Sequence, residues 1–343
     1  MPQQSDIPHS KVERWLGAFV GFYRPAVDEL RTLDPVSKFL YSARSLILVI
    51  SAQAAIIAGL LAAADRQFNG LYFALVLIGF VVAHMISNLS NDYFGYRRGH
   101  DTPDSPRMRY TVHPLASGVL EPRVLISGIA ILALIGLGIA AFFVLVHGWL
   151  ATVFAAAGIA LLFAYDAAPV PLKSIGLGEV AVFLVWGPLM VGGGYAVIAG
   201  HVSIEAMLVS IPYGLGVMSI LIGKHIDQRE FDHSRGIHTL PVLLGESGAR
   251  FLNLFLIVLM YAVTAGLILL GQLTPFAAVV LVALPRAARA WSTLWSPRPS
   301  TAPAGYVGWP LWYHRACLVH NRLFGWLYIL GLAAGVIWPT VRW

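Results

Sequence analysis

Long apolar runs alternate with short polar stretches along most of the chain. Each run is close to the ~20 residues that an α-helix needs to cross ~30 Å of hydrocarbon. The runs fall at about 44–64, 71–90, 122–146, 149–165, 176–199, 204–223, 251–271, 274–291 and 322–340. The pattern predicts an all-α, polytopic membrane protein with about nine transmembrane helices.

The composition supports the same class of protein. Of 343 residues, 58% are hydrophobic and 12% are charged, against roughly 25% charged in a soluble domain. With a mean hydropathy of +0.73, a soluble chain of this length could not bury its apolar surface. The net charge of +6 would suit nucleic acid in a soluble protein, but membrane topology explains it better, and no nucleic-acid partner is expected. The one cysteine, Cys317, excludes an internal disulfide.

The chain divides into an N-terminal segment, residues 1–37, and a transmembrane domain, residues 38–343. Scattered aromatic residues in the polar first segment indicate that it lies at the membrane surface. Its start lacks the basic and apolar regions of a secretory signal, so we expect no cleaved leader.

Lysine and arginine are distributed unevenly over the two ends of the expected helices. Of the 23 Lys and Arg residues, all but Arg66 and Arg342 fall on the side of the N-terminus and the even-numbered loops. Because cytoplasmic loops carry the excess of positive charge, we expect that side to be cytoplasmic and the C-terminus to be outside. The lipid bilayer would be the inner or plasma membrane of the cell.

Two polar clusters lie at the ends of the second and sixth apolar runs. Polar side chains at such a depth in a membrane lose their contact with water, which is costly, and they are therefore usually functional. Asn88 and Asp92 lie four residues apart, on one face of a helix, and Asn91 is their neighbour. Amide and carboxylate oxygens suit Mg²⁺, which takes one or two carboxylates and fills its other positions with water and phosphate oxygens. The alternative is that Asn91 or Asp92 caps the end of the helix.

The second cluster contains Asp227, Glu230 and Asp232, preceded by Lys224, and we expect it to lie in the sixth loop. We expect the two clusters to face one another and to hold a divalent metal against a diphosphate. Ordinary ion pairs in a solvated loop are the alternative. Between the clusters, Lys173 either binds a diphosphate or reaches toward lipid headgroups.

At these residues the chain resembles the UbiA superfamily of intramembrane prenyltransferases, above all the branch with 1,4-dihydroxy-2-naphthoate prenyltransferase. The resemblance runs from about residue 40 to 335, and it is specific only as a combination of motifs. It rests on residues 88–102 (NLSNDYFGYRRGHDT), 113–118 (HPLASG), 165–173, 176–179, 183–195 and 224–246.

The resemblance implies helices around a central cavity, Mg²⁺ as the cofactor, and transfer of an isoprenyl group from a prenyl diphosphate to an aromatic, quinone-precursor-like acceptor. The carboxylates implied to be catalytic are Asp92, Asp227 and Asp232. The metal would be bound by Asn88, Asn91, Asp92, Asp101, Asp227 and Asp232. The diphosphate would be bound by Arg97, Arg98, Lys173 and Lys224.

The chain departs from the motifs of that family. Gly95 stands where the first motif has its second Asp, and His113 replaces an Arg that many relatives have. In the second motif, Lys224, Asp227 and Gln228 replace the expected Asn and Arg-Asp pair. Asp92, Asp101, Asp104, Asp227 and Asp232 remain as acidic residues for a site.

Ionisation of an allylic diphosphate places negative charge on the leaving group, and cations must stabilise that charge. The carbocation left behind requires a dry site with aromatic or apolar walls, for which Phe183, Trp186 and Tyr195 are candidates. Two other functions stay open: a terpene cyclase that acts on prenyl diphosphate alone, and a non-catalytic protein that binds or transports lipid.

Overall fold

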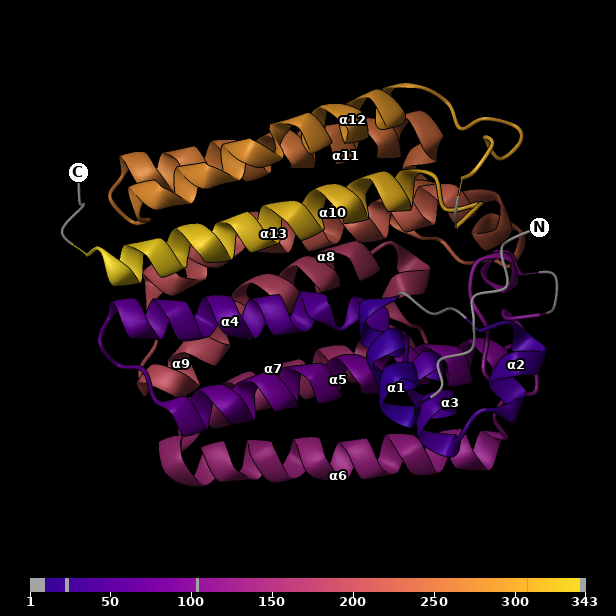
Figure 1. The fold of residues 1–343 in the computed structure, drawn as a ribbon, viewed down its shortest axis with the longest axis horizontal. Coiled ribbons are helices and arrows are strands. Elements are labelled where there is room, and N and C mark those ends of the chain that lie inside the picture. The colour runs from indigo at the N-terminus through magenta and orange to yellow at the C-terminus, as the bar shows by residue number, and fades with distance from the viewer. Residues whose placement is uncertain (1–9, 22–24, 103–104, 307, 340–343) are drawn as a thin grey trace.

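The computed structural model describes residues 10–21, 25–102, 105–306 and 308–339, and this part of the chain forms helices without a strand. Figure 1 shows long helices running roughly side by side, with three short N-terminal helices at one end. The helices are α1 (Lys11–Val20), α2 (Val27–Thr32), α3 (Pro35–Ser42), η1 (Ser45–Ile47), α4 (Val49–Ala64), α5 (Gly70–Arg97), η2 (Pro106–Arg109), α6 (Pro122–His147), α7 (Trp149–Asp166), η3 (Leu172–Ile175), α8 (Gly178–Leu184), η4 (Val185–Gly192), α9 (Gly193–Ala199), α10 (Ile204–Ser234), α11 (Leu240–Leu269), η5 (Pro275–Ala283), α12 (Leu284–Trp295) and α13 (Tyr313–Ile337).

Nine helices in the described residues are long and apolar enough to cross a membrane, which confirms the predicted fold class. Two of them continue well beyond their apolar runs. The second, α5, reaches Arg97, and the sixth, α10, reaches Ser234. Both polar clusters therefore lie on helices, and the prediction that Asp227 and Asp232 lie in a loop is wrong. Backbone hydrogen bonding carries each helix on past the apolar surface that predicted it.

The N-terminal segment folds onto the end of the bundle as α1, α2 and α3. Ser10 caps α1 and forms a capping box with Glu13. Asp34 caps α3 by accepting the Ser37 N–H at 3.0 Å, and it also accepts the Trp15 indole N–H at 3.3 Å, so the same carboxylate joins α1 to α3. Location at the membrane surface stays a prediction.

One bundle helix, the fifth, is interrupted where it passes the centre of the protein. Residues 185–192 form a π-helix with Pro188 inside it, and Gly187 has a non-helical backbone (φ −90°, ψ −106°). Proline lacks the N–H of the helical ladder and clashes with the preceding turn. The bulge turns the Trp186 side chain into the protein, where its indole N–H reaches Ser51.

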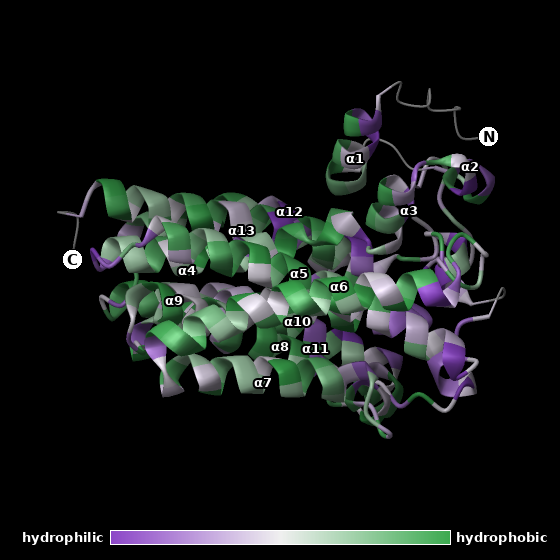
Figure 2. Cartoon of the chain, turned by 90° about the horizontal axis from the view of Figure 1, so that it is seen from below, coloured by the Kyte–Doolittle hydropathy of each residue, from purple (hydrophilic) through white to green (hydrophobic). Residues whose placement is uncertain are grey.

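The helices differ in how much of their surface the protein covers. In α10, 72% of the most apolar window is buried inside the protein, but in α6 the share is only 6%. Leu134 and Leu145 of α6 are among the exposed side chains. An apolar outer surface of this kind suits contact with lipid. Figure 2 shows apolar residues along the length of the bundle and polar residues gathered mainly at the end that carries α1–α3.

Candidate active site

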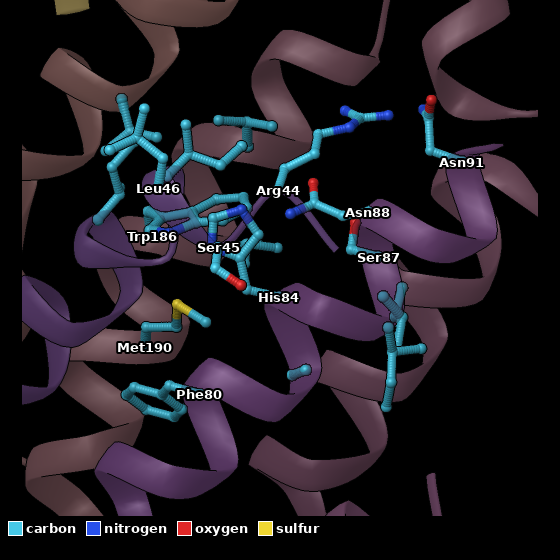
Figure 3. A pocket seen from close by; sticks show the side chains of 18 of the residues that line it. Arg44, Ser45, Leu46, Phe80, His84, Ser87, Asn88, Asn91, Trp186 and Met190 are labelled. Carbon is cyan, nitrogen blue, oxygen red and sulfur yellow. The ribbon is translucent and has the colours of Figure 1, made fainter. Parts of the chain in front are cut away.

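A cavity of about 1360 Å³ lies between the helices and reaches from the apolar middle of the bundle to its polar end. Small-molecule sites usually measure about 300–1,000 Å³, so this one has room for a long apolar chain beside a second molecule. Its wall is apolar over most of its length, with Phe80, Trp186 and Met190 among the lining residues. Figure 3 shows Arg44, Asn88 and Asn91 along one end of the cavity, and Phe80 and Met190 away from them.

The Asp92 carboxylate is fully buried near the polar end, between two arginine side chains. Arg107 donates to both carboxylate oxygens, with Nη2 at 2.7 Å from Oδ2, and Arg44 makes a close ion pair with Oδ1. Asn88, one turn earlier on α5, donates to the Ala43 carbonyl at 3.0 Å. The spacing correctly placed Asn88 and Asp92 on one face, and that face packs against the segment before α4.

Asp227 is held by the first turn of α13. Its two carboxylate oxygens accept the backbone N–H groups of Tyr313 (3.1 Å) and His314 (2.9 Å), and Arg298 Nη1 lies 3.9 Å away. This contact accounts for the start of α13 at Tyr313, nine residues before the apolar run that predicted it. Asp232 lies five residues further along α10, roughly 140° around the helix, so the two carboxylates point in different directions.

The carboxylate of Asp101 occupies the space beside Gly95. A Cβ atom at Gly95 would lie only 2.0 Å from Asp101 Oδ2. The same oxygen lies 3.2 Å from His113 Nε2, and His113 Nδ1 accepts the backbone N–H groups of Leu115 and Ala116, which places the ring proton on Nε2. Burial would raise the pKa of Asp101, but His113 and neighbouring cations hold it below its ordinary value. Burial lowers the pKa of His113, against the opposing effect of Asp101.

A third polar group joins α5 to the loop after α7. Asp166 is buried and forms a close ion pair with Lys173, and Asn91 donates to its two oxygens at 3.0 and 3.2 Å. Arg98 donates to the main-chain carbonyls of Asp166 (2.6 Å) and Ala168 (2.9 Å). Lys173, for which the sequence left a diphosphate or lipid headgroups as partners, is thus paired with Asp166 in the structure.

The two predicted clusters meet at the same end of the bundle. Gln228 of α10 donates to the Tyr110 hydroxyl at 2.9 Å, and Arg235 donates to Thr102 Oγ1 at 3.0 Å, so α10 is tied to the loop that follows α5. Lys224 interacts electrostatically with Arg44, Arg107 and Asp232. Asp232 itself is buried, and its Oδ2 has no hydrogen-bond partner among the described residues.

A hydrogen-bonded group that sequence reasoning did not find lies deeper in the cavity wall. The Trp186 indole N–H donates to Ser51 Oγ at 3.0 Å, and Ser51 Oγ lies 2.9 Å from His84 Nδ1. The three residues come from η4, α4 and α5, and Figure 3 shows two of them, Trp186 and His84, close together. In the sequence, this group is indicated only by two polar residues inside apolar runs, Ser51 in the first run and His84 in the second.

Several predicted residues lie apart from the cavity. Arg97 is exposed and its guanidinium lies over the Tyr93 ring, 5.9 Å from the centroid. Tyr195 donates to Asp65 at 2.6 Å, lies near His201 and is packed in a cluster of buried apolar residues from α4, α5 and α9. Of the three aromatic residues proposed for the wall, Trp186 lines the cavity, but Phe183 and Tyr195 do not. Glu230 is exposed, and Asp104 lies outside the described residues.

The helical bundle, its lateral apolar surface and a large cavity with a cationic end define a membrane-embedded protein with an internal site. Residues 52–312 match the UbiA prenyltransferase family. The chain belongs to this family, which confirms the resemblance and the predicted enzyme class, a prenyltransferase.

Curated relatives are similar over much of the chain. The 1,4-dihydroxy-2-naphthoate octaprenyltransferase of Bacillus subtilis is 26% identical over 225 residues, which cover 64% of this chain and 70% of that protein. The protein of the same name from Haemophilus influenzae is 27% identical and covers 56% of this chain and 63% of its own length. The chain thus spans about two thirds of the length of these relatives.

Solved structures share the fold. A UbiA homolog from Aeropyrum pernix K1 superposes with a TM-score of 0.61 at 17% identity, over 85% of this chain and 98% of that one. A UbiA homolog from Archaeoglobus fulgidus bound to GPP and Mg²⁺ gives a TM-score of 0.60 at 15% identity, over 86% and 99%.

The Mg²⁺ that the family implies does not fit the side chains at this site. Asp92 is paired with two arginines, Asp227 with two backbone N–H groups, Asp101 with His113, and Asp166 with Lys173. Among the described carboxylates, Asp232 Oδ2 and Glu179 Oε2 are the buried oxygens without a hydrogen-bond partner, and the other oxygen of Glu179 lies 2.6 Å from His225 Nδ1. Within the described residues, no three His, Cys, Asp or Glu side chains are grouped to hold a metal ion. The assignment of these residues as metal ligands stays a prediction that this arrangement does not support.

Proposed function

We propose that this protein transfers an isoprenyl group from a prenyl diphosphate to an aromatic acceptor within the membrane. The observation that carries the proposal is the cavity, whose long apolar wall suits a prenyl tail and whose polar end carries Arg44, Arg107 and Lys224. An apolar tail and a diphosphate head require these two surfaces side by side.

The reaction follows from this division of the cavity. The allylic C–O bond of the donor breaks, and both electrons leave with the diphosphate, whose growing negative charge the cationic side chains stabilise. A ring carbon of the acceptor then forms the new C–C bond with the allylic cation, and the ring proton passes to the released diphosphate. The apolar walls keep water from capturing the cation.

The acceptor would approach from the deeper part of the cavity. There His84 and Trp186 offer the polar and aromatic surface that a hydroxylated ring requires. Relatives are named for a naphthoate acceptor, and we extend that substrate class to this chain.

The test uses the purified full-length chain in detergent with geranyl diphosphate and 1,4-dihydroxy-2-naphthoate, with products identified by mass spectrometry. We expect a prenylated naphthoate. A cyclic hydrocarbon or alcohol formed without the acceptor would identify a terpene cyclase instead. Binding of geranyl diphosphate with no product from any acceptor would identify a lipid-binding protein.

A further inference from the structure

Among the described residues, the polar wall of the cavity contains cations and amides but no carboxylate. Among the described residues that line it, the cationic side chains are Arg44, Arg107, Arg109, Lys224, Arg315 and Arg322, and the amides are Asn88 and Asn91. A site that held its anionic substrate through a carboxylate-bound metal would turn its carboxylates toward the cavity. The polar wall of this cavity is positively charged instead.

Two of these arginines have donors left without an acceptor. The Nε atoms of Arg44 and Arg107 are buried and have no hydrogen-bond partner among the described residues, and Arg107 is only 6% exposed. A buried donor without a partner is costly. The carboxylate of Asp92 carries one negative charge, and the two guanidinium groups carry two positive charges. The three side chains together therefore have a net positive charge. An oxyanion in the cavity would balance this positive charge through the parts of the two side chains that line the wall.

The family carboxylates that are absent from the sequence are not replaced within the cavity. Gly95 leaves no room for a side chain while Asp101 occupies its position, and Asp101 faces His113. Gln228 stands in place of an acid in the second motif, and its amide donates to Tyr110. Lys224 stands where a neutral amide was expected, and it adds a third cation to the cavity wall that Arg44 and Arg107 line.

We propose that Arg44, Arg107 and Lys224 bind the diphosphate of the donor directly, in place of a carboxylate-bound Mg²⁺. This inference rests on the proposed function. Guanidinium groups bind phosphate oxygens through paired, charge-assisted hydrogen bonds. They would then also stabilise the leaving group as the C–O bond breaks.

The experiment measures binding by isothermal titration calorimetry, with the full-length chain in detergent and with inorganic pyrophosphate and geranyl diphosphate as probes. Each titration is run with Mg²⁺ and with excess EDTA. We expect the same Kd under both conditions, and weaker binding as the salt concentration rises, because the contacts are ionic.

Two variants locate the binding site. Arg107→Gln leaves Asp92 paired with Arg44, and we expect it to weaken binding by about tenfold or more, since charged hydrogen bonds are the strong ones. Lys224→Gln removes a cation of the cavity wall that forms no ion pair with the described residues. It provides a second test if Arg107→Gln does not fold. Arg286→Gln, an exposed arginine of α12 outside the cavity wall, is the matched control and should bind like the wild type.

The outcomes separate this inference from the proposed function. Binding that requires Mg²⁺ and is lost in EDTA would overturn the direct cationic contact but would leave the prenyl diphosphate site in place. Binding in EDTA that neither variant weakens would show that the anion binds elsewhere and would also overturn it. No binding of geranyl diphosphate under either condition would refute the proposed function itself.

Discussion

Gly95→Ala is the substitution whose effect the structure determines most sharply. The new Cβ would lie 2.0 Å from Asp101 Oδ2, and ordinary contacts begin at about 3.4 Å. The carboxylate must therefore move by more than 1 Å, and its 3.2 Å contact with His113 Nε2 would be lost. Alanine is elsewhere a better helix former than glycine, so the sign of the effect depends on this one contact.

The magnitude follows from two opposing contributions. His113 Nε2 faces the carboxylate at 3.2 Å without the alignment of a full hydrogen bond, so the contact contributes at most the about 1.5–3 kcal/mol of a hydrogen bond to a charged group. Replacing glycine by alanine within a helix favours folding by about 0.8–1.0 kcal/mol. We therefore expect Gly95→Ala to lower the free energy of unfolding, by at most about 2 kcal/mol. In an Asp101→Ala background the clash is absent, and the same change should stabilise the protein.

The assay is thermal unfolding in detergent, followed with a fluorogenic dye that reacts with thiols. Cys317 is the one cysteine in the sequence and is fully buried, so it reacts when the bundle opens. Gly138→Ala, at a glycine of α6 with nothing within 4 Å of the new Cβ, is the matched control. A Gly95→Ala variant as stable as Gly138→Ala, or a double variant with purely additive effects, would refute the reasoning.

Three further predictions concern other polar contacts. Asp34→Ala removes the cap of α3 and the acceptor of Trp15, and should cost about 1 kcal/mol of stability, with increased proteolysis near α1 as the readout. Asn253→Ala breaks two buried hydrogen bonds with Ser219 and should cost about 0.6–1.7 kcal/mol of stability, measured by the same thermal assay; no change would mean that these hydrogen bonds contribute nothing. His84→Phe should raise KM for the aromatic acceptor more than for the prenyl diphosphate, and equal effects on both would contradict its place on the acceptor side.

The number and order of the membrane helices could be predicted from the sequence because the bilayer acts on local composition. About twenty consecutive apolar residues are stable in hydrocarbon only as a helix, and each of the nine runs became one. The ends of the helices could not be predicted in this way. For example, α13 begins at Tyr313 because Asp227 accepts backbone hydrogen bonds from its first turn, and hydrophobicity carries no information about such hydrogen bonds.

The family and the candidate residues could also be predicted, since the motifs are contiguous in the chain. What the motifs do not contain is the partner of each charged group. Asp92 meets Arg44 from 48 residues away, and Asp227 meets the backbone of Tyr313 from 86 residues away. A carboxylate's chemistry depends on which cation or N–H group lies beside it, and the packing of helices that are distant in sequence decides that. The sequence thus determined the membrane fold and the end of the bundle at which the charges gather. The tertiary structure decided that arginine and lysine side chains line the polar end of the cavity.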